Sequence, residues 1–397
     1  MRVVEFDSLF QFIRNGMNVK QDKSGKGIPI TRIETIANGT VDASRVGFAD
    51  LSEADCRNWI MEPGDILFSH INSVEHVGKC AVYRGSPKKL VHGMNLLCLR
   101  CDETQLIPDF AKYLISGKDF RSRLSNFINK AVNQASVSIG NLKTIRVSVP
   151  CIPEQRRIAA ILDQADALRA KRREALAQLD SLTQSIFIEM FGDLASNSKG
   201  WTINPLNNFI FAVTNGLTRR RSENNEGADI VLRLRDIRSG WIDFSDVNRI
   251  TMEPIETKRY SVSPGDLLFI RVNGNPDYVG RCAIFEGYSE PVFFNDHIMR
   301  VKVDSTRIHS TFLAFLLNSK HGKNEIAKYR KTSAGQHTIN QDGLGKIQVP
   351  TPPVTLQAEF VRHLESIGRQ KNAFNESHLE LDALFSSLQH RAFRGEL

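Results

Sequence analysis

Two stretches of the chain are nearly the same text: "EPGDILFSHINSVEHVGKCAVYRG" spans Glu62 to Gly85, and "SPGDLLFIRVNGNPDYVGRCAIFEG" spans Ser263 to Gly287. Pro-Gly-Asp followed by an apolar triplet predicts a turn that leads into a short strand, and "CAVY" or "CAIF" predicts a second strand. The residues between Phe68 and Val77 differ from their counterparts, although the flanks are shared. The pattern indicates one scaffold used twice, with a different variable segment in each copy.

The repeat extends far beyond these stretches. Residues 77–81 align with 279–283 at an offset of 202, and the helical apolar patterns at 108–129 and 310–331 align at the same offset. Upstream the offset is one or two smaller, so that Arg32-Ile33 aligns with Arg233-Leu234. We therefore expect two homologous units, each with about 150 residues of short strands and helices followed by about 40 residues of another kind.

Length and composition set the broad class. The chain has 397 residues, enough for two domains, and its 41% hydrophobic and 24% charged residues are typical of a globular protein. The net charge of +8 and pI near 9.2 favour a polyanionic partner but suit many enzymes as well. The first sixteen residues, "MRVVEFDSLFQFIRNG", lack the apolar core of a signal peptide, and no apolar run approaches twenty residues. We expect a cytoplasmic protein.

The six cysteines do not indicate a metal site. Cys98 and Cys101 form a CxxC pattern, but no second pair follows at the spacing of a zinc ribbon, so buried thiols are favoured. Cys80 and Cys282 occupy matched points of the two copies, in "GKCAVY" and "GRCAIF". We expect both to be small apolar core residues.

A long helix follows the mixed part of each unit. No Gly or Pro interrupts the chain from Glu154 to Met190, and Pro153 suits a helix start. When positions are taken alternately four and three residues apart from Ile161, as in a coiled-coil seam, seven of the nine are apolar. The nine positions 202 residues later include five apolar residues. A stripe roughly 55 Å long is too long for one domain to cover, so the two helices are expected to pack on each other. The expected pairing residues are Ile161, Leu168, Leu179, Leu182, Ile186, Ile367, Phe374, Leu381, Leu384 and Leu388.

These patterns give the expected organisation of the chain. Residues 1–150 and 202–352 are the two mixed domains, 153–191 and 355–393 are the long helices, and the polar stretch "GDLASNSKGW" at 192–201 is a linker.

The chain resembles the specificity subunits of type I restriction–modification systems. The resemblance rests on "VPCIPEQRRIAAILDQADAL" and "SIFIEMFGD" around the first helix, on the order domain–helix–domain–helix, and on the final "AFRGEL". It covers the whole chain. Two junctions depart from the family pattern: the second reads "VPTPPVTLQAEFVRHL" in place of a form rich in Pro-Glu-Gln, and the first reads "CIPEQ" where a second proline is usual. The departures concern how the helices dock on the domains.

The resemblance implies both a fold and a function. It implies two α/β (mixed α+β) target recognition domains, duplicated and pseudo-two-fold symmetric, separated by long antiparallel coiled-coil helices. Each domain would read one half of a bipartite double-stranded DNA target, and the helices would set the spacer and dock two DNA-adenine methyltransferase subunits. Restriction subunits would complete a host-defence nuclease. S-adenosylmethionine, ATP and Mg²⁺ would bind to the partner subunits, and none of them to this chain.

The residues themselves contain no recognisable catalytic motif. No G-x-x-x-x-G-K-[ST] phosphate loop and no G-x-S-x-G elbow occurs. Asn275-Pro276-Asp277-Tyr278 is close to the Asn-Pro-Pro-Tyr motif of adenine methyltransferases, but Asp replaces the second proline and no glycine-rich turn precedes it. We expect a non-catalytic subunit. The alternatives are a coiled-coil scaffold without sequence-specific DNA binding and a stand-alone methyltransferase.

Local charge and polarity suggest where DNA would bind. Basic residues gather at 117–146 and 320–346, next to the polar segments "NKAVNQASVS" (129–138) and "RKTSAGQHTIN" (330–340). Such residues can contact phosphates and base edges, and the lack of interleaved aromatic residues favours duplex over single-stranded DNA. A solvated helix face, an ordinary polar loop and drift in a surface turn are the alternatives. The candidates are His70, Asn72, His76, Lys118, Arg121, Arg123, Lys130, Asn133, Gln134, Ser136, Arg219, Arg220, Arg221, Arg271, Asn273, Asn275, Lys328, Arg330, Lys331, Thr332, Ser333, Gln336 and His337.

Overall fold

The computed structural model describes residues 1–131, 134–218, 229–333 and 335–397. The chain forms two compact units. Unit 1 comprises Met1–Ala175 together with Phe374–Leu397, and unit 2 comprises Leu176–Ala373. The long helices are α5 (Ile152–Phe191) and α10 (Val354–Arg394). The boundary between the units passes through both helices, so each unit contains the start of one and the end of the other.

Unit 1 is built mainly from short strands. Its helices besides α5 and α10 are α1 (Glu53–Cys56), α2 (Pro108–Ser116), α3 (Lys118–Ser125) and α4 (Ile139–Lys143). Its strands are β1 (Arg2–Glu5), β2 (Phe10–Asn15), β3 (Ile28–Ile30), β4 (Gly47–Ala49), β5 (Ile66–Phe68), β6 (Ile71–Asn72), β7 (Cys80–Val82), β8 (Leu97–Cys101), β9 (Asn129–Ala131), β10 (Gln134–Ser136) and β11 (Arg146–Val149). The 3-10 turns are η1 (Phe6–Leu9), η2 (Ile33–Ile36), η3 (Ala43–Arg45) and η4 (Arg57–Trp59).

Unit 2 has a matching set of elements. Its strands are β12 (Ile203–Pro205), β13 (Ile210–Asn215), β14 (Asp229–Leu232), β15 (Arg249–Ile250), β16 (Leu267–Ile270), β17 (Val272–Asn273), β18 (Cys282–Ile284), β19 (Val292–Phe294), β20 (Ile298–Val303), β21 (Lys331–Ser333), β22 (Gln336–Thr338) and β23 (Gln348–Pro350). Its helices are α6 (Pro254–Tyr260), α7 (Ser310–Asn318), α8 (Lys320–Tyr329) and α9 (Gln341–Gly345), with 3-10 turns η5 (Leu206–Asn208), η6 (Leu234–Asp236) and η7 (Pro276–Tyr278).

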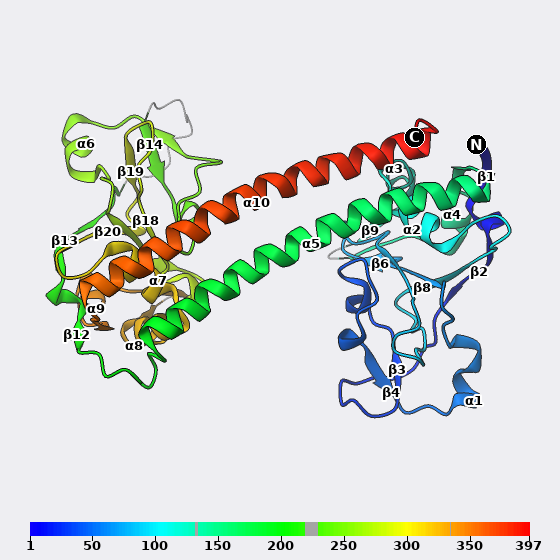
Figure 1. The fold of residues 1–397 in the computed structure, drawn as a ribbon, viewed down its shortest axis with the longest axis horizontal. Helices are drawn as coiled ribbons and strands as arrows, with labels where there is room; N and C mark the ends of the chain where they lie inside the picture. The colour runs from blue at the N-terminus through cyan, green and yellow to red at the C-terminus, as the bar shows by residue number, and fades with distance from the viewer. Residues whose placement is uncertain (132–133, 219–228, 334) are drawn as a thin grey trace. The chain divides into compact units, whose positions relative to one another are not determined.

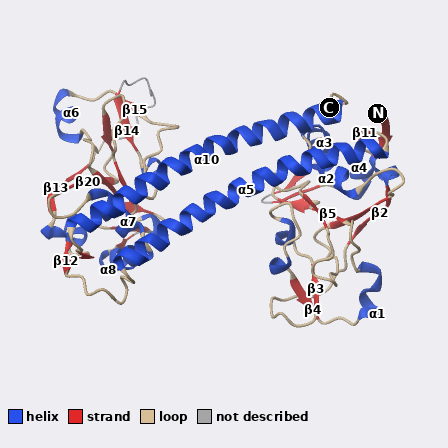
Figure 2. Ribbon diagram, viewed as in Figure 1, coloured by secondary structure: helices blue, strands red, loops and turns tan. Residues whose placement is uncertain are grey.

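Both units mix helices and strands (Figure 2), and three of their sheets have matching topology. The antiparallel sheet β2-β8-β5-β7 corresponds to β13-β20-β16-β18, the pair β1-β11 to β12-β23, and the small sheet β6-β10-β9 to β17-β22-β21. The units differ at one place: unit 1 has the antiparallel pair β3-β4, whereas unit 2 has β15-β14-β19 with β14 parallel to β19. The structure therefore confirms a duplicated, mixed helix-and-strand fold.

Close packing explains why the two copies of the repeat share certain residues. Gly78 and Gly280 both have a φ of +85°, and a Cβ there would lie 2.8 Å from Leu124 and 2.6 Å from Ile326, respectively. A residue with a side chain would be strained in this backbone conformation and would also clash. The adjacent Cys80 and Cys282 are buried in the cores as expected. The glycine and the cysteine in "GKC" and "GRC" thus belong to the scaffold.

The CxxC pattern has no chelating geometry. Cys98 and Cys101 are buried in strand β8 and are three residues apart, so they point to opposite faces of the sheet. Desolvation by burial raises the pKa of both thiols. Among the described residues, no group of three or more His, Cys, Asp and Glu could hold a metal ion. No helix in the described ranges is long and apolar enough to cross a membrane.

The unusual junctions dock the two long helices in the same way. Gln155 is fully buried: its Nε2 donates to the carbonyl oxygens of Gln105 (2.7 Å) and Pro150 (3.0 Å), and its Oε1 accepts from the N–H of Ile107 (3.0 Å). Gln357, at the offset of 202, is also fully buried. It accepts from the N–H of His309 at 2.8 Å and donates to the carbonyl of Pro352 at 2.8 Å. The departures from the family pattern therefore leave this buried glutamine in place.

In unit 1 the start of α5 packs antiparallel against the end of α10 (Figure 1). Arg169 pairs with Asp382 at 2.5 Å and lies over the ring of Phe385, while Arg172 lies over the ring of Phe374 at 4.3 Å. Contacts made later in α5 are made earlier in α10, as an antiparallel pair requires. The last turns of α10 join the core of the domain, where Ala392 is fully buried and Phe393 packs on Phe110 with the ring centroids 5.3 Å apart.

Unit 2 repeats this arrangement with the helices exchanged. Lys371 pairs with Asp180 at 2.5 Å, and these two positions match Arg169 and Asp382 at the offset of 202. The end of α5 joins the core through Phe187, whose ring lies 5.2 Å from that of Phe360. Matched contacts made by exchanged partners are the signature of two-fold related packing. Each domain therefore packs against the start of one long helix and the end of the other.

Three of the ten expected seam residues are corrected. Leu168, Leu182 and Leu384 are 52%, 46% and 50% exposed and lie outside the seam. Arg169, four residues after the buried Ala165, takes the place in the seam that was expected for Leu168. Its side chain forms an ion pair with Asp382 of the other helix. A frame chosen by apolarity alone misses a charged residue that faces the partner helix. Leu179 and Ile367 are buried, whereas Ile161, Ile186, Phe374, Leu381 and Leu388 are partly buried.

Candidate nucleic-acid interface

The two candidate segments of unit 1 meet in one small sheet. Strand β6 comes from the variable segment, and β9 and β10 form the hairpin about sixty residues later. Asn72 pairs with Ala135, and Ala131 pairs with Gln134. All three residues of β9 are exposed, so core packing does not explain this strand. A strand that buries no side chain yet holds a fixed register is well suited to contact another molecule.

Unit 2 forms the equivalent sheet from its own segments. Asn273 of β17 pairs with His337 of β22, and His337 also pairs with Thr332 of β21. The hydroxyl of Thr332 lies 2.9 Å from Nδ1 of His337. All three residues of β21 are exposed, as they are in β9. The structure thus brings together in both units the segments that the sequence singled out separately.

The prediction for His70 is corrected. Its side chain is only 7% exposed, and burial lowers its pKa to about 4, so it is neutral at pH 7 and lies beneath the surface. Its carbonyl accepts from the N–H of Val137 at 2.9 Å and so joins the variable segment to the hairpin. The matched residue Arg271 makes the same backbone bond, to Ile339 at 2.9 Å, and its Nη1 donates to the carbonyl of Asp296 at 3.1 Å. Both positions support the sheet.

Several amide candidates shape the variable loops. Asn72 donates to the hydroxyl of Ser69 at 3.2 Å and is partly buried, whereas His76 is exposed. In unit 2, Oδ1 of Asn273 accepts from the N–H of Asn275 at 2.9 Å. Oδ1 of Asn275 accepts in turn from the N–H of Asp277 at 3.0 Å and caps η7. The Asn-Pro-Asp-Tyr segment is therefore a capped surface turn.

The basic stretches do not form a single surface beside the hairpins. Lys118, Arg123 and Arg146 line a groove with Gln389 and His390 of α10, and Arg123 donates to the carbonyl of Arg146. This groove lies against the end of the long helix. Three of the basic residues of 117–146 therefore face the long helix, whereas Lys130 belongs to strand β9.

Other basic candidates have protein partners. Lys328 pairs with Glu325, and Arg330 donates to the carbonyl of Pro276 at 2.8 Å, which ties the start of β21 to the variable loop. Arg121 is partly buried. The exposed candidates of the two small sheets are Lys130, Gln134, Lys331, Thr332, Ser333 and Gln336, with Ser136 and His337 partly buried. Asn133, Arg219, Arg220 and Arg221 lie outside the described residues.

A cavity beside the first sheet contains residues that the sequence analysis missed. It has a volume of about 240 Å³, and its lining includes Glu34 of turn η2 together with Ser69, Asn72, His76 and Lys79. The alignment of Arg32-Ile33 with Arg233-Leu234 was the available signal, because the next aligned pair is Glu34 and Arg235. In unit 2, Arg235 lines a cavity of about 370 Å³ with Arg233, Asn248 and Asn295, among others.

Comparison with known proteins identifies the family. The model of the "Type I restriction modification DNA specificity domain" family matches residues 1–178 and 199–381. The chain therefore belongs to this family, and the match covers both units.

Individual relatives agree with this assignment. A putative type I restriction enzyme MjaX specificity subunit of Methanocaldococcus jannaschii is 37% identical over 190 residues, a match that covers 48% of this chain and 45% of that protein. The StySPI specificity subunit of Salmonella potsdam is 27% identical over 390 residues, covering 93% of this chain and 82% of that subunit. The EcoKI specificity subunit of Escherichia coli is 23% identical over 392 residues, with the same coverage.

Solved structures share the fold. The crystal structure of a type I system S subunit from M. genitalium has a TM-score of 0.59 at 16% identity and covers 99% of this chain and 96% of that chain. A chain from a structure on the assembly and conformational transition of the type I system has a TM-score of 0.55 at 16% identity, covering 100% and 98%. Family membership favours the DNA-recognition hypothesis over the scaffold alternative.

Proposed function

We propose that the chain is the non-catalytic specificity subunit of a type I restriction–modification complex and recognises a bipartite sequence in double-stranded DNA. The observation that supports this most strongly is the pair of matched small sheets, β6-β10-β9 and β17-β22-β21. Their backbones correspond strand by strand, while the side chains of their hairpin strands differ at every position except the shared Gln134 and Gln336. A common scaffold with different polar side chains is what two readers of two different half-sites require.

The helix pair would set the distance between the two half-sites. Matched ion pairs, Arg169 with Asp382 and Lys371 with Asp180, fix its antiparallel register. Because an α-helix rises 1.5 Å per residue and resists compression, a paired helix can act as a spacer of defined length. The register of the helix pair would then determine the number of base pairs in the spacer.

Two methyltransferase subunits would dock on this chain. Leu182 and Leu384 are related by the offset of 202 and are 46% and 50% exposed. Exposed apolar residues repeated at matched positions are consistent with two equivalent docking sites, one on each helix. Restriction subunits would join this core. The partners would bind S-adenosylmethionine, ATP and Mg²⁺. The cytoplasmic location remains a prediction.

Methylation mapping tests the proposal. The chain is expressed with its methyltransferase partner in cells that lack other adenine methylation, and modified adenines are mapped across the genome. The expected result is one motif made of two short specific half-sites separated by a fixed number of unspecified base pairs. A motif with a single continuous site, or methylation that does not depend on this chain, would contradict the proposal.

A further inference from the structure

The 3-10 turns η2 and η6 occupy the same place in the two units and are capped in the same way. In unit 1 the N–H of Arg32 donates to Oγ1 of Thr35 at 2.9 Å. In unit 2 the N–H of Arg233 donates to Oδ2 of Asp236 at 2.7 Å. The backbone N–H of Thr35 donates in return to the carbonyl of Arg32 at 3.0 Å. The N–H of Asp236 donates in the same way to the carbonyl of Arg233 at 2.9 Å. The two turns are therefore structurally equivalent.

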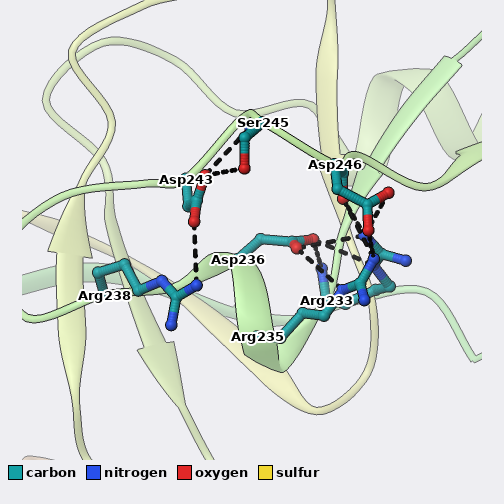
Figure 3. Close-up of polar contacts among 7 residues, drawn as sticks. All are labelled: Arg233, Arg235, Asp236, Arg238, Asp243, Ser245 and Asp246. Atoms are coloured by element: carbon teal, nitrogen blue, oxygen red, sulfur yellow. Dashed lines mark hydrogen bonds and ion pairs between the residues drawn. The ribbon is translucent and has the colours of Figure 1, made fainter. Parts of the chain in front are cut away.

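The chain leaves both turns along the same path. Seven residues on, the N–H of Asp42 donates to the carbonyl of Thr35 at 2.9 Å, and that of Asp243 donates to the carbonyl of Asp236 at 2.8 Å. Each of these aspartates then accepts from the N–H of the serine two residues later, at 2.9 Å in unit 1 and 3.1 Å in unit 2. Figure 3 shows side-chain contacts of the unit 2 turn, including those of Asp243 with Ser245 and Arg238. The backbone match makes residue-by-residue comparison of the turns secure.

Within this matched turn one position carries opposite charges. Glu34 of unit 1 corresponds to Arg235 of unit 2, and their side chains are 41% and 56% exposed. Glu34 is held by Lys23 at 2.9 Å and Arg32 at 3.2 Å. The hydrogen bond from Lys23 lowers the pKa of Glu34 below its usual value. Arg235 is held by Asp246 and by Asp236 at 3.7 Å (Figure 3).

The surrounding contacts orient both groups without using all of their capacity. Both cations reach the same oxygen of Glu34, Oε1. A carboxylate offers two oxygens with about four acceptor sites, so acceptor capacity remains at Oε2. The partners of Arg235 engage Nη2 and Nε, while a guanidinium has five N–H donors, so Nη1 can still donate. Exposed ion pairs contribute little to stability, and orientation of the side chain is their main consequence here.

In unit 1 this position lies beside the proposed reading surface. Glu34 lines the same cavity as Asn72 and His76, both from the variable segment that feeds strand β6. A polar side chain next to the varying residues, on a scaffold shared by both units, is where a difference in base preference would arise.

We propose that Glu34 and Arg235 are specificity-determining residues that read one base pair each, with opposite hydrogen-bonding character. Glu34 accepts from the exocyclic N4 amino group of a cytosine, and Arg235 donates to O6 and N7 of a guanine, as these side chains do in the major groove. Both side chains then select a G·C base pair, but the matched position contacts the cytosine in one half-site and the guanine in the other. The inference rests on the proposed function.

The test uses the complex of the full chain with its methyltransferase partner and a panel of duplexes. Each base pair of the wild-type motif is changed in turn, and binding is measured for the wild type, for Glu34→Gln and for Arg235→Gln. For Glu34→Gln we expect discrimination to fall roughly tenfold to a hundredfold at one base pair of the first half-site, with the second half-site unchanged. Arg235→Gln should do the same in the second half-site only.

Controls separate base reading from general effects. Glu53→Gln removes an exposed carboxylate of unit 1 that pairs with Lys89 outside the turn, and Arg238→Gln removes the neighbouring arginine that pairs with Asp243; neither should change the motif. A uniform loss of affinity on all sequences, or an unchanged pattern, for both turn variants overturns the inference. Failure of the proposed function is distinguishable, because the wild-type complex would then show no bipartite motif at all.

Discussion

Truncation of Phe187 tests whether the end of α5 belongs to the core of unit 2. Phe187 is 6% exposed, and its ring centroid lies 4.9 Å from that of Phe315 and 5.2 Å from that of Phe360. Removing a buried phenylalanine returns roughly 160 Å² of apolar burial, which at about 25 cal/mol per Å² amounts to about 4 kcal/mol, within the range of about 3–5 kcal/mol seen for Phe→Ala in cores. Phe187→Ala should therefore destabilise unit 2 by about 4 kcal/mol.

Hydrogen exchange read by mass spectrometry is the suitable assay, because a chain of two units need not unfold in one step. Strand β16 reports on unit 2 and strand β5 on unit 1. Amides of β16 that exchange through opening of the unit should exchange up to about a thousandfold faster in the variant, since about 1.4 kcal/mol corresponds to a factor of ten. Amides of β5 should exchange at the wild-type rate.

A matched control comes from the same helix. Leu182 is 46% exposed and lies five residues before Phe187, so Leu182→Ala should lower the stability of unit 2 by less than about 1 kcal/mol. Equal effects of the two substitutions, or loss of protection in β5 as large as in β16, would refute the packing described for the end of α5.

Three further outcomes are expected. Inserting seven residues into both α5 and α10, after Ala175 and Ala373, adds about 10 Å to the helix pair and should lengthen the spacer in the methylation motif by about three base pairs. An unchanged spacer would show that the helices do not set its length. His92 is 1% exposed, and its pKa is lowered to about 4, mainly by burial, so the unfolded state binds the extra proton and stability is lost as the pH falls from about 6.5 towards 4. Urea unfolding should show about 2 kcal/mol less stability for unit 1 at pH 5 than at pH 7 from this residue, and His92→Phe, which introduces the residue found at the matched Phe294, should reduce the pH dependence by that amount. Gln155→Ala leaves the N–H of Ile107 and two carbonyls without their partner and should destabilise unit 1 by about 1–3 kcal/mol, seen as faster hydrogen exchange of the β5 amides, whereas the exposed Gln134→Ala should leave that exchange unchanged.

The duplication and the long helices could be predicted from sequence because each produces a regular pattern. The matched Gly78 and Gly280, and the uninterrupted run after Pro153, follow from backbone sterics and helix periodicity alone. The helix seam was predictable only in part, because three of its ten expected residues are exposed. Apolarity selected Leu168, whereas the structure places Arg169 opposite Asp382, and an ion pair between two helices leaves no signal in the periodicity of one.

The candidate site was harder to predict because it depends on long-range pairing. Nothing in the local sequence indicates that Asn72 lies opposite Ala135, or that His70 is buried. The run of basic residues suggested one surface, but Arg123 lies by the end of α10, and Lys130 belongs to the hairpin. Charge counts along a chain do not report which side of a helix or strand faces which neighbour. The alignment of Arg32-Ile33 with Arg233-Leu234 already pairs Glu34 with Arg235, but the matched hydrogen bonds of the two turns are visible only in the structure.

A transplant of one reading surface into the other unit tests most directly whether the matched sheets carry specificity. Residues 70–77 and 129–138 of the first unit are replaced by 271–279 and 331–340 of the second, and modified adenines are mapped in cells that also express the methyltransferase partner. The account predicts that only the first half-site changes, towards an inverted copy of the second, with the spacer and the second half-site preserved. Retention of the original first half-site by a folded, active complex would contradict it.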